Sequence, residues 1–139
     1  MMAAGLAAPA ADKPYPIYTA DNFTNSMKLC GRNFGAVSAA VSGKDFDTAK
    51  AQLVRTRELL AVTITFWRDR NKEDAIKILR DTLTEIDALD TTLSAETVDA
   101  ANANAITGRI SSNCQACHAV YRVQDLETKS YRFKPGLVQ

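Results

Sequence analysis

Apolar residues in the middle of this chain recur at intervals of three and four, and this spacing is the strongest constraint on its fold. The clearest case is the stripe Ile76, Leu79, Leu83, Ile86 and Leu89, which lies on one face of a helix but on both faces of a strand. Alanine, leucine and charged residues dominate this region, and they favour helix. Because no segment shows a convincing strand-like alternation, we expect an all-α protein.

Four segments carry such a stripe, and we predict helices near 19–42, 45–70, 71–90 and 95–123. The expected N-caps are Thr19, Asp45, Asn71 and Ser94. The stripe of the first helix is Phe23, Met27, Cys30, Phe34, Val37 and Val41, and that of the last is Val98, Ala101, Ala105, Ile110, Cys114, Cys117 and Tyr121. Four amphipathic helices with short loops imply an antiparallel four-helix bundle, which can hold a cofactor between facing helices.

The chain divides into three parts. Residues 1–18 contain three of the four prolines and are expected to form an extended lead-in. Its segment Ala8-Pro9-Ala10 has the A-x-A form of a signal-peptidase site, so the lead-in is either the last part of an export signal or an ordinary Ala/Pro-rich tail. Residues 19–123 form the bundle domain, and 124–139 form a non-helical tail that can pack back on it.

The overall charge excludes some classes of partner. The formal net charge is +1, so nothing points to nucleic acid or to an acidic polymer. No apolar run approaches 18 residues, and we therefore expect no transmembrane segment.

The segment Cys114-Gln115-Ala116-Cys117-His118 is a C-x-x-C-H sequence, the signature of c-type haem attachment. Two thiols three residues apart can reach the two vinyl groups at one edge of a porphyrin, and the next residue then places an imidazole under the iron. We predict one covalently bound haem c, with Cys114 and Cys117 as thioether anchors and His118 as the proximal iron ligand.

Other interpretations of the two cysteines have less support. A thioredoxin-type redox disulfide requires a βαβ context, and a structural zinc site requires four ligands, usually in two separated pairs. A plain structural disulfide would not need the histidine. The chain offers only Cys30 as a further cysteine, and we expect it to pack as a small hydrophobe or to face the haem.

His118 is the only histidine, so bis-histidine ligation within one chain is excluded. The sixth iron position then takes a methionine, another side chain or a small molecule, or it stays open. Met27 is the only methionine inside a predicted helix. A methionine on an apolar stripe commonly fills a gap in the core, but with a haem to cover we predict that Met27 faces the iron and is its second axial ligand.

The chain resembles the class II cytochromes c, that is, cytochrome c′ and its low-spin relatives. The segment 114–122, CQACHAVYR, is similar to the family motif C-x-x-C-H-x-x-[YF]-R on the last helix. In the first helix, Ser26-Met27 falls where the family has Leu-Met or Ala-Leu. Gly35-Ala36-Val37 and the segment 41–47, VSGKDFD, follow it. The chain departs from the family in having no arginine shortly before Met27, a very short second loop and a longer tail.

The resemblance implies roles for further residues. Arg122 would lie beside the proximal face of the haem or a propionate, or else be a solvated arginine. Met27 and Phe34 would line the distal side, where low-spin members bind iron through methionine and cytochrome c′ proper stays five-coordinate.

We therefore expect a periplasmic bacterial cytochrome, not an enzyme, that transfers electrons through one haem to a redox partner protein. The alternative is five-coordinate binding of NO or CO. A homodimer is left open.

Overall fold

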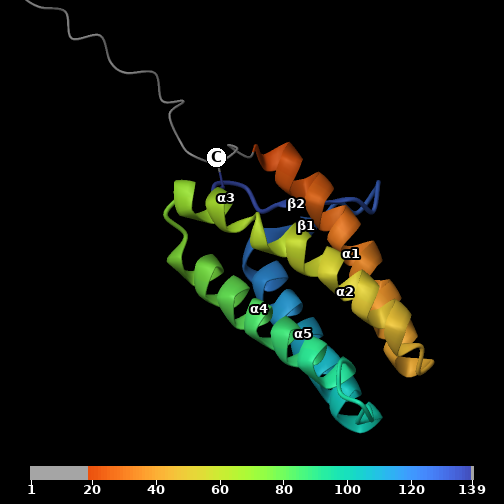
Figure 1. The fold of residues 1–139 in the computed structure, drawn as a ribbon. Coiled ribbons are helices and arrows are strands. Elements are labelled where there is room, and N and C mark those ends of the chain that lie inside the picture. Colours follow the sequence, from red (N-terminus) through yellow and green to blue (C-terminus); the bar gives the residue numbers. More distant parts are fainter. Residues whose placement is uncertain (1–18, 139) are drawn as a thin grey trace, which may run out of the picture.

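The computed structural model describes residues 19–138, and most of them are helical (Figure 1). The long helices are α1 (Ala20–Ser42), α2 (Phe46–Ala61), α4 (Glu73–Leu93) and α5 (Ala100–Tyr121), and α3 (Ile64–Asp69) is short. Strands β1 (Arg122–Gln124) and β2 (Tyr131–Phe133) form one antiparallel hairpin. The expectation of a mostly helical protein is confirmed, whereas the predicted lead-in lies outside the described residues.

The long helices lie side by side in two pairs. Helix α1 packs along α2 and α4 along α5, while α2 also contacts α4 and α1 contacts α5. Figure 1 shows the α1–α2 and α4–α5 connections at one end of the molecule, and α3 and the hairpin toward the other. None of the helices between residues 19 and 138 combines the length and apolar character needed to cross a bilayer.

Two of the predicted helix starts are confirmed. The Thr19 side chain accepts a hydrogen bond from the Asn22 backbone N–H at 3.0 Å, and the Asn22 side chain accepts one from the Thr19 N–H. The Asp45 carboxylate accepts a bond from the Thr48 N–H and caps α2. These caps satisfy backbone donors that have no partner inside the helix.

The other two predicted caps are wrong. Asn71 adopts a left-handed conformation with φ 55° before the start of α4, and the N-cap position is Lys72, which makes no side-chain cap. Asparagine tolerates positive φ better than most residues. Ser94 ends α4, and its N–H donates back to the Asp90 carbonyl. Helix α5 starts only at Ala100, where Asp99 is the cap.

The predicted helix over 45–70 is interrupted at Val62 and Thr63. The Thr63 hydroxyl donates to the Leu60 carbonyl at 2.6 Å. β-Branched residues and hydroxyls that bond to nearby carbonyls both compete with regular helix. After the interruption, α3 carries Phe66 and Trp67 into the core, and both are buried.

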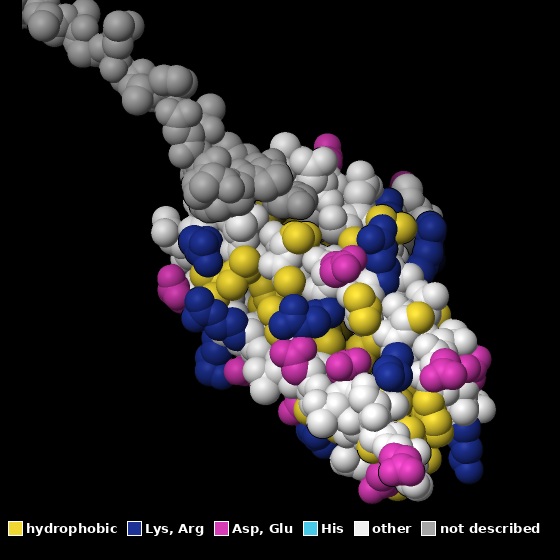
Figure 2. Space-filling view, viewed as in Figure 1, with side chains coloured by type: hydrophobic (Ala, Val, Ile, Leu, Met, Phe, Trp, Pro, Cys, Tyr) yellow, Lys and Arg dark blue, Asp and Glu magenta, His cyan; other side chains and the backbone are white. Residues whose placement is uncertain are grey.

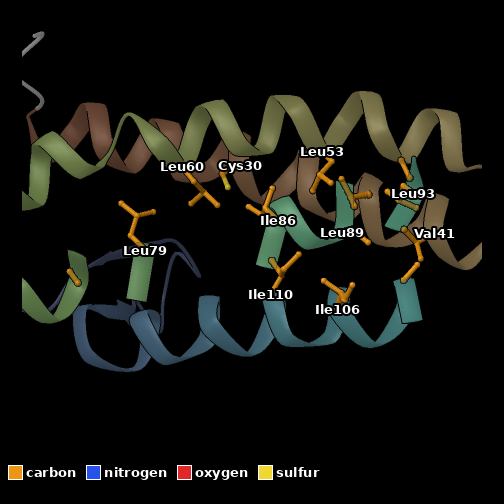
Figure 3. Packing of buried hydrophobic residues seen from close by; sticks show 14 of the residues in the cluster. Cys30, Val41, Leu53, Leu60, Leu79, Ile86, Leu89, Leu93, Ile106 and Ile110 are labelled. Carbon is orange, nitrogen blue, oxygen red and sulfur yellow. The ribbon is translucent and has the colours of Figure 1, made fainter. Parts of the chain in front are cut away.

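The core is closely packed at the end that holds the α1–α2 and α4–α5 connections. Figure 3 shows Val41, Leu53, Ile86, Leu89, Leu93, Ile106 and Ile110 pointing toward one another from α1, α2, α4 and α5. The stripes predicted for the first and third helices are buried or half-buried as expected. In the last helix Ala101 and Ala105 are exposed, contrary to prediction, because the larger Ile106 and Ile110 determine which face is buried.

Aromatic rings fill the opposite end. Phe23 stacks on Phe66 with ring centroids 4.5 Å apart, and Trp67 lies 4.6 Å from Tyr121. Phe133 of β2 contacts three of these rings, with centroid distances of 5.2 to 6.1 Å. The hairpin is therefore docked on the helices through its aromatic side chain.

Candidate functional site

A cavity of about 490 Å³ lies between α1, α4, α5 and the hairpin. Its lining is predominantly apolar, and its size is within the range of small-molecule sites in proteins. All three cysteines of the chain and its only histidine line this cavity, together with Met27. The lining residues whose side chains carry sulfur or an imidazole are Met27, Cys30, Cys114, Cys117 and His118.

Helix α1 forms one wall through the middle of its apolar stripe. Met27 and Phe34 are half-buried, and Cys30 between them is buried with 6% exposure. Their spacing of three and four residues keeps all three on one helix face. In Figure 3 Cys30 lies near Leu60 and Leu79, which line the cavity as well. The cavity therefore lies directly beside the packed core.

Helix α5 contributes the C-x-x-C-H segment to the same cavity. Cys114 and Cys117 are one turn apart, free of disulfides and half-buried. Burial raises the pKa of both thiols, that of Cys117 to about 11. Both side chains are therefore neutral thiols at neutral pH.

His118 is half-buried in the last turn of α5. Burial, and after it the nearby Arg122 cation, lowers the pKa of the imidazole below its usual value. The neutral form, which is the form that binds metals, is therefore favoured. Its Nδ1 atom is buried and has no hydrogen-bond partner within residues 19–138. A buried polar atom without a partner is uncommon and often marks a missing ion or ligand.

Cys30 belongs to the core and to the cavity wall at once. Burial, with a smaller contribution from Cys114, raises the pKa of its thiol to about 12. The expectation left two options for this residue, packing as a small hydrophobe or facing the cofactor, and its position agrees with both.

Arg122 follows α5 directly and lines the cavity from β1. Its guanidinium carbon lies 3.7 Å from the centroid of the Tyr131 ring, a cation–π contact. Ser130, Tyr131, Arg132 and Phe133 of the hairpin also line the cavity. No periodic pattern in the sequence marks these residues, because their position depends on a chain reversal after the last helix.

The alternative of a zinc module depends on a cluster of donor side chains. Within residues 19–138, no group of three or more His, Cys, Asp and Glu side chains is placed to hold a metal ion.

Comparison with known proteins adds no relative. The chain matches no protein-family model, no curated protein and no solved structure.

Proposed function

We propose that this chain is a single-haem c-type cytochrome of the class II kind, a four-helix bundle that transfers electrons. One observation carries the proposal: the cavity is lined both by the C-x-x-C-H segment of α5 and by Met27 of α1. Two residues far apart in sequence, His118 and Met27, thereby share a site of ligand size. Histidine and methionine are the side chains that would hold the iron in a cytochrome c.

The side chains present fit a covalently attached haem. Cys114 and Cys117 are free thiols one turn apart, as attachment to two vinyl groups requires. His118 is a half-buried imidazole with a lowered pKa and an orphaned Nδ1 atom. The apolar lining would exclude water from both faces of a flat hydrophobic ring. When bound, the haem would supply a one-electron redox centre.

The chain's own residues then set the properties of that centre. Neutral His118 would hold the iron from α5. Met27 would provide a thioether, a ligand that raises the reduction potential relative to bis-histidine ligation. Phe34 would cover the distal side beside Met27, since both are half-buried on one face of α1. We assign no catalytic residue and infer that the partner is a redox protein.

We place the protein in the periplasm of a bacterium. The support is the C-x-x-C-H motif together with the A-x-A segment of the lead-in. Covalent attachment would keep the cofactor with an exported chain.

A second candidate is reversible binding of NO or CO. The apolar cavity favours it, since an uncharged diatomic molecule could occupy the apolar space that Met27 and Phe34 line. The two candidates differ in one property, whether Met27 would bind the iron of the haem.

Absorption spectroscopy separates the candidates. The chain is expressed with a haem-maturation system, purified, and measured in the ferric and ferrous states. Electron transfer predicts a low-spin ferric spectrum with a Met–Fe charge-transfer band near the red edge. A high-spin ferric spectrum would favour gas binding, and a colourless protein would reject both.

A further inference from the structure

The charged residues that line the cavity all have one sign. Among residues 19–138 they are Lys28, Arg122 and Arg132, and no aspartate or glutamate of that range lines the cavity. The chain as a whole is balanced, with 17 basic and 16 acidic residues, and Figure 2 shows both signs mixed on the face it displays. A cavity with basic but no acidic lining residues is thus a local departure from the overall composition.

The three cations come from three elements that meet at the cavity. Lys28 follows Met27 on α1, Arg122 begins β1, and Arg132 lies in the middle of β2. The hairpin that carries two of them is held in place, because Lys134 donates through its Nζ to the Ala119 carbonyl at 2.6 Å. Their placement is therefore defined by the fold and does not depend on a free tail.

These cations differ from four basic side chains that do form ion pairs. Arg55, Arg57, Lys77 and Arg109 each pair with a carboxylate on the helix surface. In the described part of the chain no ion pair involves Lys28, Arg122 or Arg132. Arg132 is close enough to Asp125 to contribute to the lowered pKa of that carboxyl, but as one of its smaller causes. Three positive charges beside an apolar cavity thus lack a bound counter-charge.

We propose that Lys28, Arg122 and Arg132 form a carboxylate-recognition rim that selects an anionic, flat, apolar ligand. This inference rests on the proposed function, in which the carboxylates are the two propionates of the haem. The family resemblance implies that Arg122 lies beside the proximal face or a propionate, or else is a solvated arginine, and the lining of the cavity adds Lys28 and Arg132. Because Lys28 and Arg132 are exposed, each contributes modestly and the effect weakens as salt is added.

The first experiment measures porphyrin binding to the haem-free chain, after circular dichroism has shown it to be helical. Protoporphyrin IX is titrated against its dimethyl ester at low salt. We expect the diacid to bind more tightly than the diester, and the double variant Lys28→Gln/Arg132→Gln to reduce this preference by about tenfold. Affinity for the diester should stay the same.

The matched control is Arg55→Gln/Lys77→Gln, which removes the same charge from exposed positions that do not line the cavity. It should leave the preference unchanged. Equal affinity for diacid and diester in the unmodified chain would overturn the recognition rim while leaving the proposed function standing. Failure of a helical chain to bind either porphyrin would reject the cavity as a haem site, and the rim with it.

A second experiment uses the mature protein and does not require the haem-free chain to fold. The propionates are coupled to glycine ethyl ester with a water-soluble carbodiimide, and the haem-bearing peptide is analysed by mass. Cations that hold the propionates should slow this reaction, so Lys28→Gln/Arg132→Gln should react several-fold faster. Equal rates in the double variant, the control and the unmodified protein would contradict the proposal.

Discussion

At the scale of single residues, sulfur and imidazole donors converge on one apolar cavity. Cys114, Cys117 and His118 reach it from α5, and Met27 and Cys30 reach it from α1. Burial keeps the thiols protonated and the imidazole neutral at neutral pH. The neutral imidazole is the form that ligates metals, and substitution of each residue tests its role separately.

Met27 is the residue on which the choice between the two candidate functions depends. Met27→Ala should convert a low-spin ferric spectrum to a high-spin one and should let CO bind quickly to the reduced protein, because the thioether ligand is lost. Leu29→Ala is the control, since Leu29 is 46% exposed on the same helix and does not line the cavity. An unchanged spectrum in Met27→Ala would exclude this residue as an iron ligand.

Two of the three cysteines, Cys114 and Cys117, should anchor the haem, and Cys30 should not. Cys114→Ala and Cys117→Ala should each retain haem through one remaining thioether, and the double variant should release all haem on acid–acetone extraction. Cys30→Ala should keep the haem bound through both thioethers, because its buried thiol lies outside the C-x-x-C-H segment. The measurement is the intact mass before and after extraction. Loss of haem from Cys30→Ala alone would contradict this division.

At the scale of elements, the hairpin completes the cavity that the helices leave. Phe133 contacts the rings of Phe23, Phe66 and Trp67, which belong to α1 and α3. The Lys134 backbone N–H donates to the Tyr121 carbonyl at 2.8 Å and joins the hairpin to the end of α5. The stability of the hairpin should therefore depend on its aromatic contact more than on its turn.

Truncating this contact provides the test. Phe133→Ala should lower the free energy of unfolding by about 2 kcal/mol, less than for a fully buried phenylalanine because Phe133 is only half-buried. The quantity is read from urea unfolding followed by circular dichroism. Leu126→Ala, in the 83% exposed position between the strands, should change it by less than about 0.5 kcal/mol. Equal effects of the two substitutions would show that the hairpin is not docked through Phe133.

A hydrogen bond between helices predicts a dependence on pH. The Tyr121 hydroxyl donates to the Asp74 carboxylate at 2.5 Å, and this bond is the largest cause of the lowered pKa of Asp74. A carboxyl whose pKa is lower in the folded than in the unfolded state stabilises the fold above the unfolded pKa. This stabilisation is lost as the pH falls through the folded pKa.

Tyr121→Phe should therefore cost about 1 kcal/mol at pH 7 and progressively less below about pH 4, the usual range of an aspartate. The comparison is between urea unfolding curves of the two proteins across this range. A cost that stays constant down to pH 2 would mean that the hydroxyl acts without the charge of Asp74.

The sequence was informative where large apolar residues repeat and where caps are unambiguous. The stripe of α1 and the caps at Thr19 and Asp45 were predicted because spacing and side-chain chemistry agree there. In α5 the many alanines carry little periodic information, so Ala101 and Ala105 were placed on the wrong face. Local spacing identifies the C-x-x-C-H segment as a motif, but it cannot show which parts of the chain surround that segment.

Two other features depended on competition or on long-range contacts. The interruption at Thr63 arises from hydroxyl hydrogen bonds that compete with the helix, and such competition is not visible in an apolar stripe. The hairpin docks through contacts between Phe133 and aromatic rings of α1 and α3, which lie far from it in the sequence. The carboxylate-recognition rim also depends on long-range contacts, because its residues come from α1 and from the hairpin.

At the scale of the whole molecule, one part of the core is packed and the other encloses a cavity. The packed part, around Leu53, Ile86 and Ile110, can stabilise the fold by burying apolar surface. The cavity is lined by the sulfur and imidazole side chains, by aromatic rings and by the residues of the carboxylate-recognition rim. This division lets one part provide stability while the other carries the site that we propose for the haem.

Peptide mass spectrometry is the decisive test of the proposed covalent haem on α5. The chain is matured with a haem-attachment system and digested, and the peptide that contains Cys114 and Cys117 is weighed. We predict that this peptide carries the mass of one haem and has no free thiol, whereas Cys30 is unmodified. A peptide of unmodified mass, with both of its thiols still reactive, would contradict the assignment.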